Sequence, residues 1–271
     1  MALGPLETLI AATEPNGSLQ GLQGNLGSFY SSLIQGSKHP YRRLIVQKTL
    51  QVAESMANLA ALTGRFADAG ESHQFLVAAT LELDLRHFHI EIRILYDKIA
   101  ELLNASARKK MQLYDSFSKL MTKLQTDPER IRQLLGDQVT QSLSNQSHFE
   151  LFRDLRDRMV HHGAAARVFP NTKDGLSFTV RRSEFRKILI QLNDFSSILE
   201  QNENYVIRTD RYLAICIAIV VQYVESLIDP LASLLSMPNY RSFRGSLSFP
   251  NVNTIRKWAF DCVRNLAKDS L

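Results

Sequence analysis

Apolar residues between positions 81 and 102 recur at alternating spacings of four and three, which is the spacing of a heptad repeat. The residues of this seam are Leu81, Leu85, Phe88, Ile92, Leu95, Ile99 and Leu102. A seam of this kind runs along one face of an α-helix, and at least one other helix has to cover it. Residues 84–94 also alternate as a strand does, but the heptad extends beyond them. The seam therefore predicts a long helix at about residues 71–107, within a bundle of helices.

Helical spacing of apolar residues continues through most of the chain. Further helices are expected at about residues 3–12, 41–66, 108–124, 126–143, 149–162, 183–199, 210–228 and 255–266. We expect Gly70 to separate the first long helix from the heptad helix, and Pro230 to bend or end the helix that contains residues 210–228. Thr126 and Glu129 have the spacing of a capping box, and Pro128 suits the first turn of the helix that follows.

Two segments depart from the helical pattern. Residues 15–36 hold five of the chain's twelve glycines, and we expect them to form a loop that lies over the bundle. Residues 166–169 and 176–180 flank Asp174-Gly175, a turn signal that predicts a small β-hairpin. The sequence thus predicts an all-α fold, a multi-helix bundle with one small β-hairpin after the helix at residues 149–162.

The length of 271 residues favours one domain with additions at both ends. We expect residues 71–201 to form the helical core. Residues 1–70 would pack on this core as an N-terminal helix, a glycine-rich loop and the first long helix. Residues 202–271 would supply C-terminal helices that complete the bundle.

Charge and cysteine content restrict the partners and the compartment. The chain has 32 Lys and Arg against 27 Asp and Glu, and its net charge of +5 favours a polyanionic partner only mildly. Cys216 and Cys262 lie in apolar helical patterns without metal-ligand spacing, which indicates reduced, buried thiols of a cytoplasmic protein. Residues 212–224 are very apolar, but a membrane span needs about 20 residues, so we expect a buried helix and no membrane partner. The start of the chain lacks the pattern of a signal peptide.

Several familiar motifs are missing from the sequence. It contains no P-loop, no GxGxxG and no GxSxG. His87 and His89 lie about 200° apart on a helix and cannot hold one ion together, so we expect surface or packing histidines, no metal site and no cofactor. Basic residues cluster after the hairpin, namely Arg181, Arg182, Arg186 and Lys187. A solvated surface is the default interpretation of this cluster, and a patch that follows phosphates is the alternative.

The stretch FELFRDLRDRMVHHG, residues 149–163, combines an apolar helical stripe with a crowd of charges. At about 100° per residue, one side of this helix carries Leu151, Phe152, Leu155, Met159 and His162. The other side carries Arg153, Arg156, Asp157, Val160 and His161. This polar side can be a solvated helix end whose charges pair with one another and whose histidine favours the helix dipole. It can also meet its own copy across a two-fold axis, where Val160 would be buried.

The pattern Arg156-Asp157-x-x-x-His161, late in a helical bundle, resembles the motif of the HEPN superfamily. In that motif an Arg is usually followed by Asn, Asp or His, with a His after four to six intervening residues. Four residues separate Arg156 from His161, and five separate it from His162, so both histidines satisfy the spacing. The resemblance covers about residues 71–201, and the segments 1–70 and 202–271 have no assigned counterpart.

The resemblance implies a metal-independent RNA endonuclease with a composite site at the interface of a homodimer. Arg156, His161 and Asp157 would then be catalytic. Substrate-binding residues would be Arg153, Arg158 and His162. A toxin or defence effector with a protein antitoxin or another partner is one role that the family suggests. Two alternatives stay open, a non-catalytic HEPN-like module that binds RNA, a nucleotide or a partner protein, and a helical structural protein outside the family.

Overall fold

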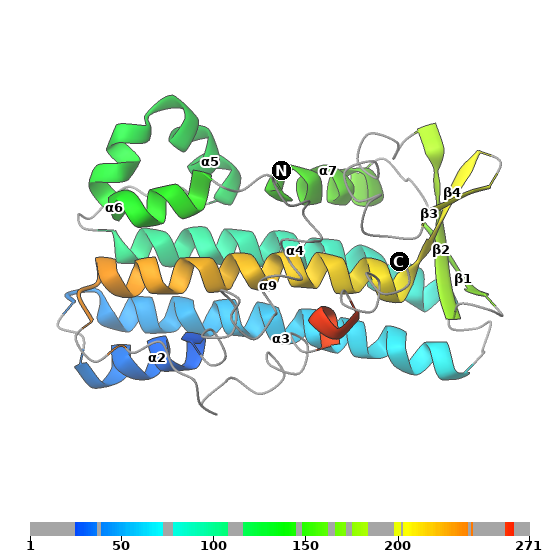
Figure 1. Ribbon diagram of the computed structural model, residues 1–271, viewed down its shortest axis with the longest axis horizontal. Helices are drawn as coiled ribbons and strands as arrows, with labels where there is room; N and C mark the ends of the chain where they lie inside the picture. Colours follow the sequence, from blue (N-terminus) through cyan, green and yellow to red (C-terminus); the bar gives the residue numbers. More distant parts are fainter. Residues whose placement is uncertain are drawn as a thin grey trace, which may run out of the picture.

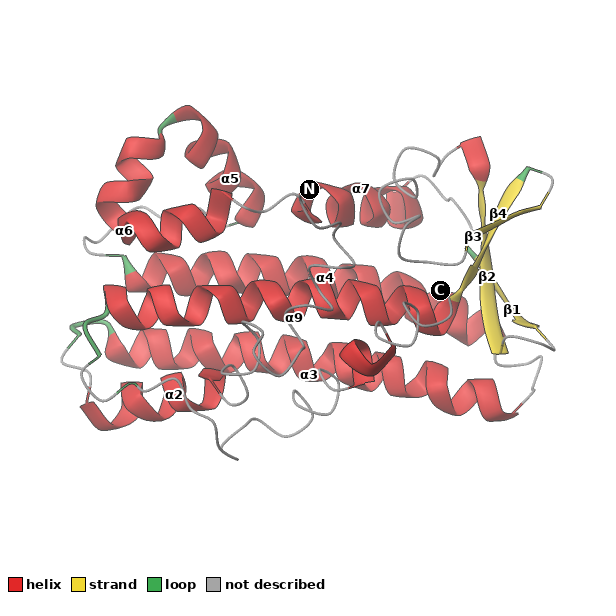
Figure 2. Ribbon diagram, viewed as in Figure 1, coloured by secondary structure: helices red, strands yellow, loops and turns green. Residues whose placement is uncertain are grey.

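The chain folds into a bundle of helices with a small antiparallel sheet at one end (Figures 1 and 2). The computed structural model describes residues 25–36, 39–72, 78–107, 116–144, 148–161, 166–171, 175–183, 198–201, 203–237, 240 and 258–262. The predicted fold class, a helical bundle with a small β element, is confirmed. Of the predicted helices, that at residues 3–12 lies outside the described residues, as do residues 184–197, most of the predicted helix at 183–199. Residues 258–262, in the last predicted helix, are helical.

Three long helices form the body of the bundle and lie side by side in Figure 1. They are α3 (Arg42–Ser72), α4 (Ala78–Ser106) and α9 (Thr209–Leu234). Every residue of the predicted heptad seam is on α4 and is buried. The expectation that a helix ends before Gly70 was wrong, because α3 continues to Ser72. One glycine inside a helix costs only about 1 kcal/mol, which the buried stripe of a long helix readily offsets.

The predicted loop at residues 15–36 is helical in its second half. Residues Asn25–Gly36 form α2, which packs against α3 and α9. Leu26, Phe29 and Leu33 point into the core at spacings of three and four. The helix forms despite its two glycines because burial of this stripe outweighs their weak helix propensity. The expectation that the segment lies over the bundle holds for the part that the structure describes.

A sharp junction separates α5 (Phe117–Thr126) from α6 (Pro128–Ser144). Pro128 opens the second helix as predicted, but Thr126 is not its cap. Thr126 still belongs to α5, and the Asp127 carboxylate accepts a hydrogen bond from the Arg130 N–H at 3.3 Å. Asp127 directly precedes Pro128 and is therefore the N-cap. From this position its carboxylate can accept a hydrogen bond from an N–H group of the first helical turn. Gly136, with φ of 76°, introduces a kink within α6.

Helix α9 runs through Pro230 and ends at Leu234, so the expected bend or end at this proline is not observed. A proline cannot donate to the carbonyl four residues earlier, which here belongs to Ser226. The Ser142 hydroxyl of α6 donates to that carbonyl at 3.4 Å. In length and composition α9 could cross a membrane, yet 83% of its most apolar window is buried inside the bundle. Cys216 is buried on α9 as predicted, and burial raises its pKa to about 12, whereas Cys262 is only partly buried.

Four strands form the sheet, in the spatial order β1-β2-β4-β3, with all neighbours antiparallel. They are β1 (Arg167–Asn171), β2 (Gly175–Arg181), β3 (Ile198–Gln201) and β4 (Asn204–Arg208). Strands β1 and β2 are the predicted hairpin. Strands β3 and β4 were not predicted, so the β element is larger than expected. Ile198 and Leu199 were predicted to end a helix, but they pair with Ile207 and Val206 of β4. The pattern of residues 183–199 could not reveal this partner strand, which follows it in sequence.

The inner face of the sheet packs against the end of the bundle. Val168, Phe178, Val180, Tyr205 and Ile207 are buried there. The Phe178 ring lies 5.1 Å from that of Tyr212 at the start of α9. Along the free edge of the sheet, the Val168 N–H donates to the Glu82 carboxylate of α4 at 3.3 Å. The sheet is therefore fixed to the bundle through its face and through one edge.

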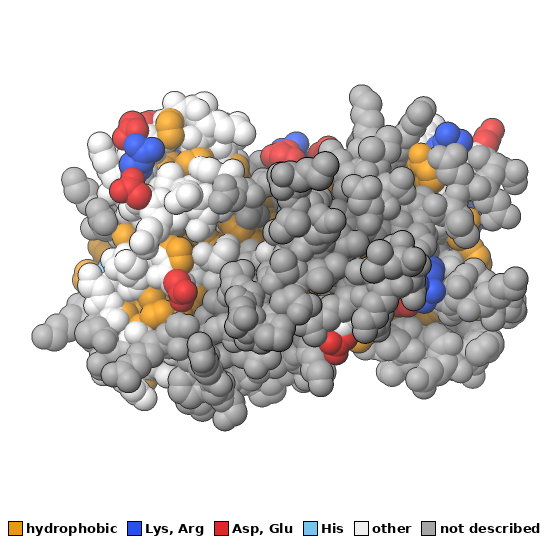
Figure 3. Space-filling model, in the orientation of Figure 1, with side chains coloured by type: hydrophobic (Ala, Val, Ile, Leu, Met, Phe, Trp, Pro, Cys, Tyr) orange, Lys and Arg blue, Asp and Glu red, His pale blue; other side chains and the backbone are white. Residues whose placement is uncertain are grey.

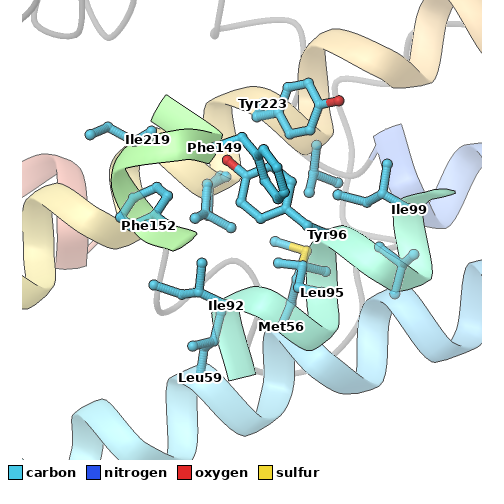
Figure 4. Packing of buried hydrophobic residues seen from close by; sticks show 14 of the residues in the cluster. Met56, Leu59, Ile92, Leu95, Tyr96, Ile99, Phe149, Phe152, Ile219 and Tyr223 are labelled. Atoms are coloured by element: carbon cyan, nitrogen blue, oxygen red, sulfur yellow. The ribbon is translucent and has the colours of Figure 1, made fainter. Parts of the chain in front are cut away.

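A cluster of aromatic rings joins four helices at the centre of the bundle (Figure 4). Its central residue is Tyr96 of α4, whose ring lies 5.0 Å from Phe117, 5.2 Å from Phe149 and 5.4 Å from Tyr223. These three partners come from α5, α7 (His148–His161) and α9. The Tyr96 hydroxyl is buried and has no hydrogen-bond partner among the described residues. Its ring, rather than its hydroxyl, is therefore what holds the helices together.

Exchange of Tyr96 tests this assignment. We expect Tyr96→Phe to unfold within about 1 kcal/mol of the wild type or to be slightly more stable, because a buried hydroxyl without a partner is removed. Tyr96→Ala should lose about 3–5 kcal/mol, because it opens a cavity among the four helices. Urea unfolding followed by circular dichroism measures both. A loss above about 2 kcal/mol in the phenylalanine variant would show that the hydroxyl has a stabilising partner.

His89 occupies an apolar position on α4, whereas His87 is exposed, as expected for a packing and a surface histidine. The His89 Nε2 atom lies 2.8 Å from the Tyr212 hydroxyl, and its Nδ1 atom has no hydrogen-bond partner among the described residues. Burial lowers the pKa of His89 to about 3. The folded protein therefore holds this imidazole neutral, and it links α4 to α9.

Acid should weaken the fold through His89. Its unfolded pKa is about 6.5, so below that pH the unfolded chain gains a proton that the folded chain refuses. The free energy of unfolding is then expected to fall by about 1.4 kcal/mol per pH unit between about pH 6 and 4 because of this residue. His89→Gln, which retains a partner for Tyr212, should remove that part of the slope. His87→Gln is the control, and an equal effect in the two variants would contradict the assignment.

Candidate functional site

Helix α7 carries the residues of the predicted site and is anchored by its apolar side. It lies along α4, between the α5–α6 pair and the sheet (Figure 1). The buried side chains on α7 are Phe149, Leu151, Phe152, Leu155 and Met159. Phe149 also contacts the Phe117 ring at 4.7 Å. The predicted apolar side of this helix is confirmed for Leu151, Phe152, Leu155 and Met159, and ring packing sets its position on the bundle.

Arg156 and Asp157 form an ion pair on the opposite side of α7. The Arg156 Nη1 atom lies 2.7 Å from the Asp157 Oδ1 atom. Their side chains are 29% and 40% exposed, so the pair is partly open to solvent, while the Arg156 Nε atom is buried. The structure thus brings together two of the three predicted catalytic residues. In this arrangement Asp157 restricts the orientation of the guanidinium.

Two further arginines lie on this helix, Arg153 and Arg158. Arg153 forms ion pairs with Glu150, one turn earlier, and with the Asp154 carboxylate at 3.5 Å. Arg158 is partly buried. Arg153 is therefore already neutralised within the helix, which makes it a weaker substrate-binding candidate than the sequence pattern alone suggested.

Val160 is an exposed apolar residue between these charges. Its exposure of 36% places it among the few large hydrophobic residues of the described chain that face solvent. It lies four residues after Arg156, one helical turn further along. Single exposed apolar residues are common on protein surfaces, so Val160 gains meaning only if a second chain covers it.

His161 is the last residue of α7, but its side chain lies outside the described residues, as does all of His162. The backbone still limits what one chain can do. Five residues along a helix correspond to a rise of about 7.5 Å and a turn of about 140°. The Cα atoms of Arg156 and His161 therefore lie on different sides of the helix axis.

Two residues that hold this helix were not identified from the sequence. The Arg93 guanidinium of α4 lies over the Phe149 ring, 5.0 Å from its centre, and pairs with Asp97 at 3.3 Å. The Asp97 carboxylate also accepts the Phe117 N–H at 2.8 Å, at the start of α5. The i,i+4 spacing of Arg93 and Asp97 was visible in the sequence, but their partners on α5 and α7 were not. Among the described residues, no three His, Cys, Asp or Glu side chains are grouped as metal ligands.

Comparisons of the chain with protein-family models, with curated proteins and with solved structures found no match.

Removal of the charges on α7 should leave the fold intact. Because Arg156 and Asp157 are partly exposed, their ion pair contributes only about 0–1 kcal/mol. Thermal unfolding of Arg156→Ala and Asp157→Ala is therefore expected within a few degrees of the wild type. Leu155→Ala, on the buried side of the same helix, should lose about 2–5 kcal/mol. A large loss in the charge variants would mean that this pair has a structural role.

Proposed function

We propose that the chain is a HEPN-like RNA endonuclease whose site is formed by the polar sides of two α7 helices in a homodimer. The observation that carries the proposal is the partly exposed Arg156–Asp157 pair on the same side of α7 as exposed Val160, while the other side of this helix is buried. A structural protein outside the family would instead be expected to pack this side against its own helices. The exposure of Asp157 and Val160 argues against that alternative.

The proposed chemistry needs one group that moves protons and one that holds the phosphate. The His161 imidazole, with a typical pKa near 6.5, takes the proton from a ribose 2′-hydroxyl. The 2′-oxygen then attacks phosphorus, the bond to the 5′-oxygen breaks, and that oxygen receives a proton from a second imidazole. The products are a 2′,3′-cyclic phosphate and a 5′-hydroxyl. Arg156 binds the phosphate oxygens and stabilises the charge that grows on them, while Asp157 orients its guanidinium.

The requirement for two imidazoles is the reason to expect a dimer. The helical wheel of the sequence assigns one histidine, His161, to the polar side of α7, so separate acid and base need the His161 residues of both subunits. Val160 would lie at the contact between the two helices and be buried there. The two-fold axis would then place one copy of Arg156 near each half of the site.

A second function is favoured by one observation. Arg156 is already paired with Asp157 within its own chain, as expected for a HEPN-like module that binds RNA, a nucleotide or a partner protein without cleaving it. Such a module would dimerise and bind through the same surface. It would lack cleavage under all conditions, and Arg156→Ala would alter only binding.

Cleavage of single-stranded RNA in EDTA tests the proposal. We expect the wild type to give products with 5′-hydroxyl ends, and Arg156→Ala and His161→Ala to lose about 10²–10⁴-fold in rate. Arg130→Ala, at an exposed arginine of α6, is the control, with an expected loss below tenfold. Equal cleavage by wild type and both catalytic variants would rule out the roles assigned to Arg156 and His161.

The composite site has a further signature in mixed dimers. A dimer of one wild-type and one His161→Ala subunit should be nearly inactive, because acid and base come from different chains. A site contained within each subunit would leave half the activity. Val160→Glu should give an inactive monomer in sedimentation experiments, whereas Leu50→Glu, at an exposed leucine of α3, should leave the dimer intact.

A further inference from the structure

We propose that the outer face of the sheet binds the sugar-phosphate backbone of single-stranded RNA and guides it toward α7. Outer face here means the residues of β1, β2 and β4 whose side chains point away from the bundle. They are Arg167, Phe169, Ser177, Thr179, Arg181, Asn204, Val206 and Arg208. That RNA is the ligand rests on the proposed function, whereas the surface itself follows from the strand register.

The register places three arginines on this one face. Arg167 of β1 pairs with Thr179 of β2, and Arg181 lies two residues further along β2. Arg208 of β4 pairs with Ser177, on the other side of Thr179. Diagonal neighbours in a sheet are about 7–8 Å apart, so Arg167 and Arg181 can contact adjacent phosphates of one strand. Of these three arginines, only Arg181 belongs to the basic cluster visible in the sequence. The fold brings Arg167 and Arg208 to the same face.

The charge of this face is positive and only partly neutralised. Arg167 and Arg181 are exposed and have no ion-pair partner in the described part of the chain. Arg208 pairs with Asp210 at 2.8 Å. The eight outer-face residues include no Asp or Glu. Arg182, next in sequence, has its guanidinium 6.0 Å from the centre of the Tyr205 ring, which belongs to the inner face, so it does not add to this surface.

The contacts available suit a nucleic-acid backbone. Ser177 and Val206, in the middle of the face, are buried, so the ligand would contact the arginines at the margin. Guanidinium groups bind phosphate oxygens in a two-pronged manner and also stack on bases. Phe169, on the same face and partly exposed, offers a ring for stacking. At this end of the molecule, Figure 3 shows basic side chains together with acidic and hydrophobic ones.

The position of the sheet favours the substrate of α7 over an unrelated ligand. Six peptide units connect His161 to Arg167, so their Cα atoms are at most about 22 Å apart. A few nucleotides of single-stranded RNA can span that distance. The same strand could therefore contact Arg167 and Arg181 while its scissile phosphate lies at Arg156. An anionic membrane would also attract arginines, but the wide apolar surface that inserts into lipid is not found among these eight residues.

Binding of a fluorescent 20-nucleotide single-stranded RNA, measured by anisotropy in a His161→Ala background, tests the inference. We expect Arg167→Gln/Arg181→Gln to raise Kd about tenfold and to reduce the slope of log Kd against log salt by about 1.4, which corresponds to two lost phosphate contacts. The matched control is Arg43→Gln/Arg130→Gln, which removes two exposed arginines from α3 and α6, far from the sheet. Arg167→Lys/Arg181→Lys should retain the slope of log Kd against log salt. Retention of this slope would show that the positive charge of the two residues causes the binding.

Several outcomes would overturn the inference, namely equal weakening by the sheet and control variants, no weakening by either, or no RNA binding by the parent. The inference would also be overturned if replacement of Arg167 and Arg181 weakened binding to phosphatidylserine vesicles but not binding to RNA. Failure of the proposed function is distinguishable. RNA binding that needs Arg167 and Arg181 without cleavage by the wild type retains this surface and removes the nuclease. If the cleavage rate at low RNA concentration is the same in the wild type and in Arg167→Gln/Arg181→Gln, the nuclease is retained and this binding surface is ruled out.

Discussion

Burial of α4 on almost every side is the constraint on which the remaining structure depends. This helix contacts α3, α5, α7, α9 and β1. Its heptad seam meets α3, and its Tyr96 ring is the meeting point of aromatic side chains from three other helices. Since the interior of a protein is packed as densely as an organic crystal, a shift of α4 would disturb all these contacts together. Helix α7 has its position because Phe149 and Phe152 join this cluster.

The anchoring of α7 separates stability from chemistry on one short helix. Its apolar side supplies the packing, and its charged side makes mainly local ion pairs that contribute little to folding. Such a division lets the polar side change its residues without loss of the fold. It also leaves Arg156 and Asp157 partly exposed and Val160 exposed, on a helix that is anchored by its buried side. A binding site benefits from that rigidity because the ligand need not order it.

Periodic patterns predicted the long elements well, and partners distant in sequence explain most of the errors. The seam on α4, the apolar side of α7 and the β1–β2 hairpin were all visible locally. By contrast, β3 exists because residues 198–201 pair with β4, and the carbonyl that Pro230 leaves free in α9 accepts a hydrogen bond from Ser142 of α6. Neither partner could be read from the spacing of the segment itself. At the candidate site, the two sides of α7 followed from a helical wheel, whereas the Arg156–Asp157 pairing and the role of Arg93 needed coordinates.

The hydrogen bond from the Val168 N–H to Glu82 has a consequence for the assembly of this protein with other chains. An edge strand with unpaired N–H groups can be extended by a strand from another molecule, which leads to domain exchange or aggregation. On β1 the side chain of a bundle helix occupies one of these groups. A foreign strand would have to displace Glu82 and leave its carboxylate without that donor. The bundle thus protects this border of the sheet against uncontrolled strand addition.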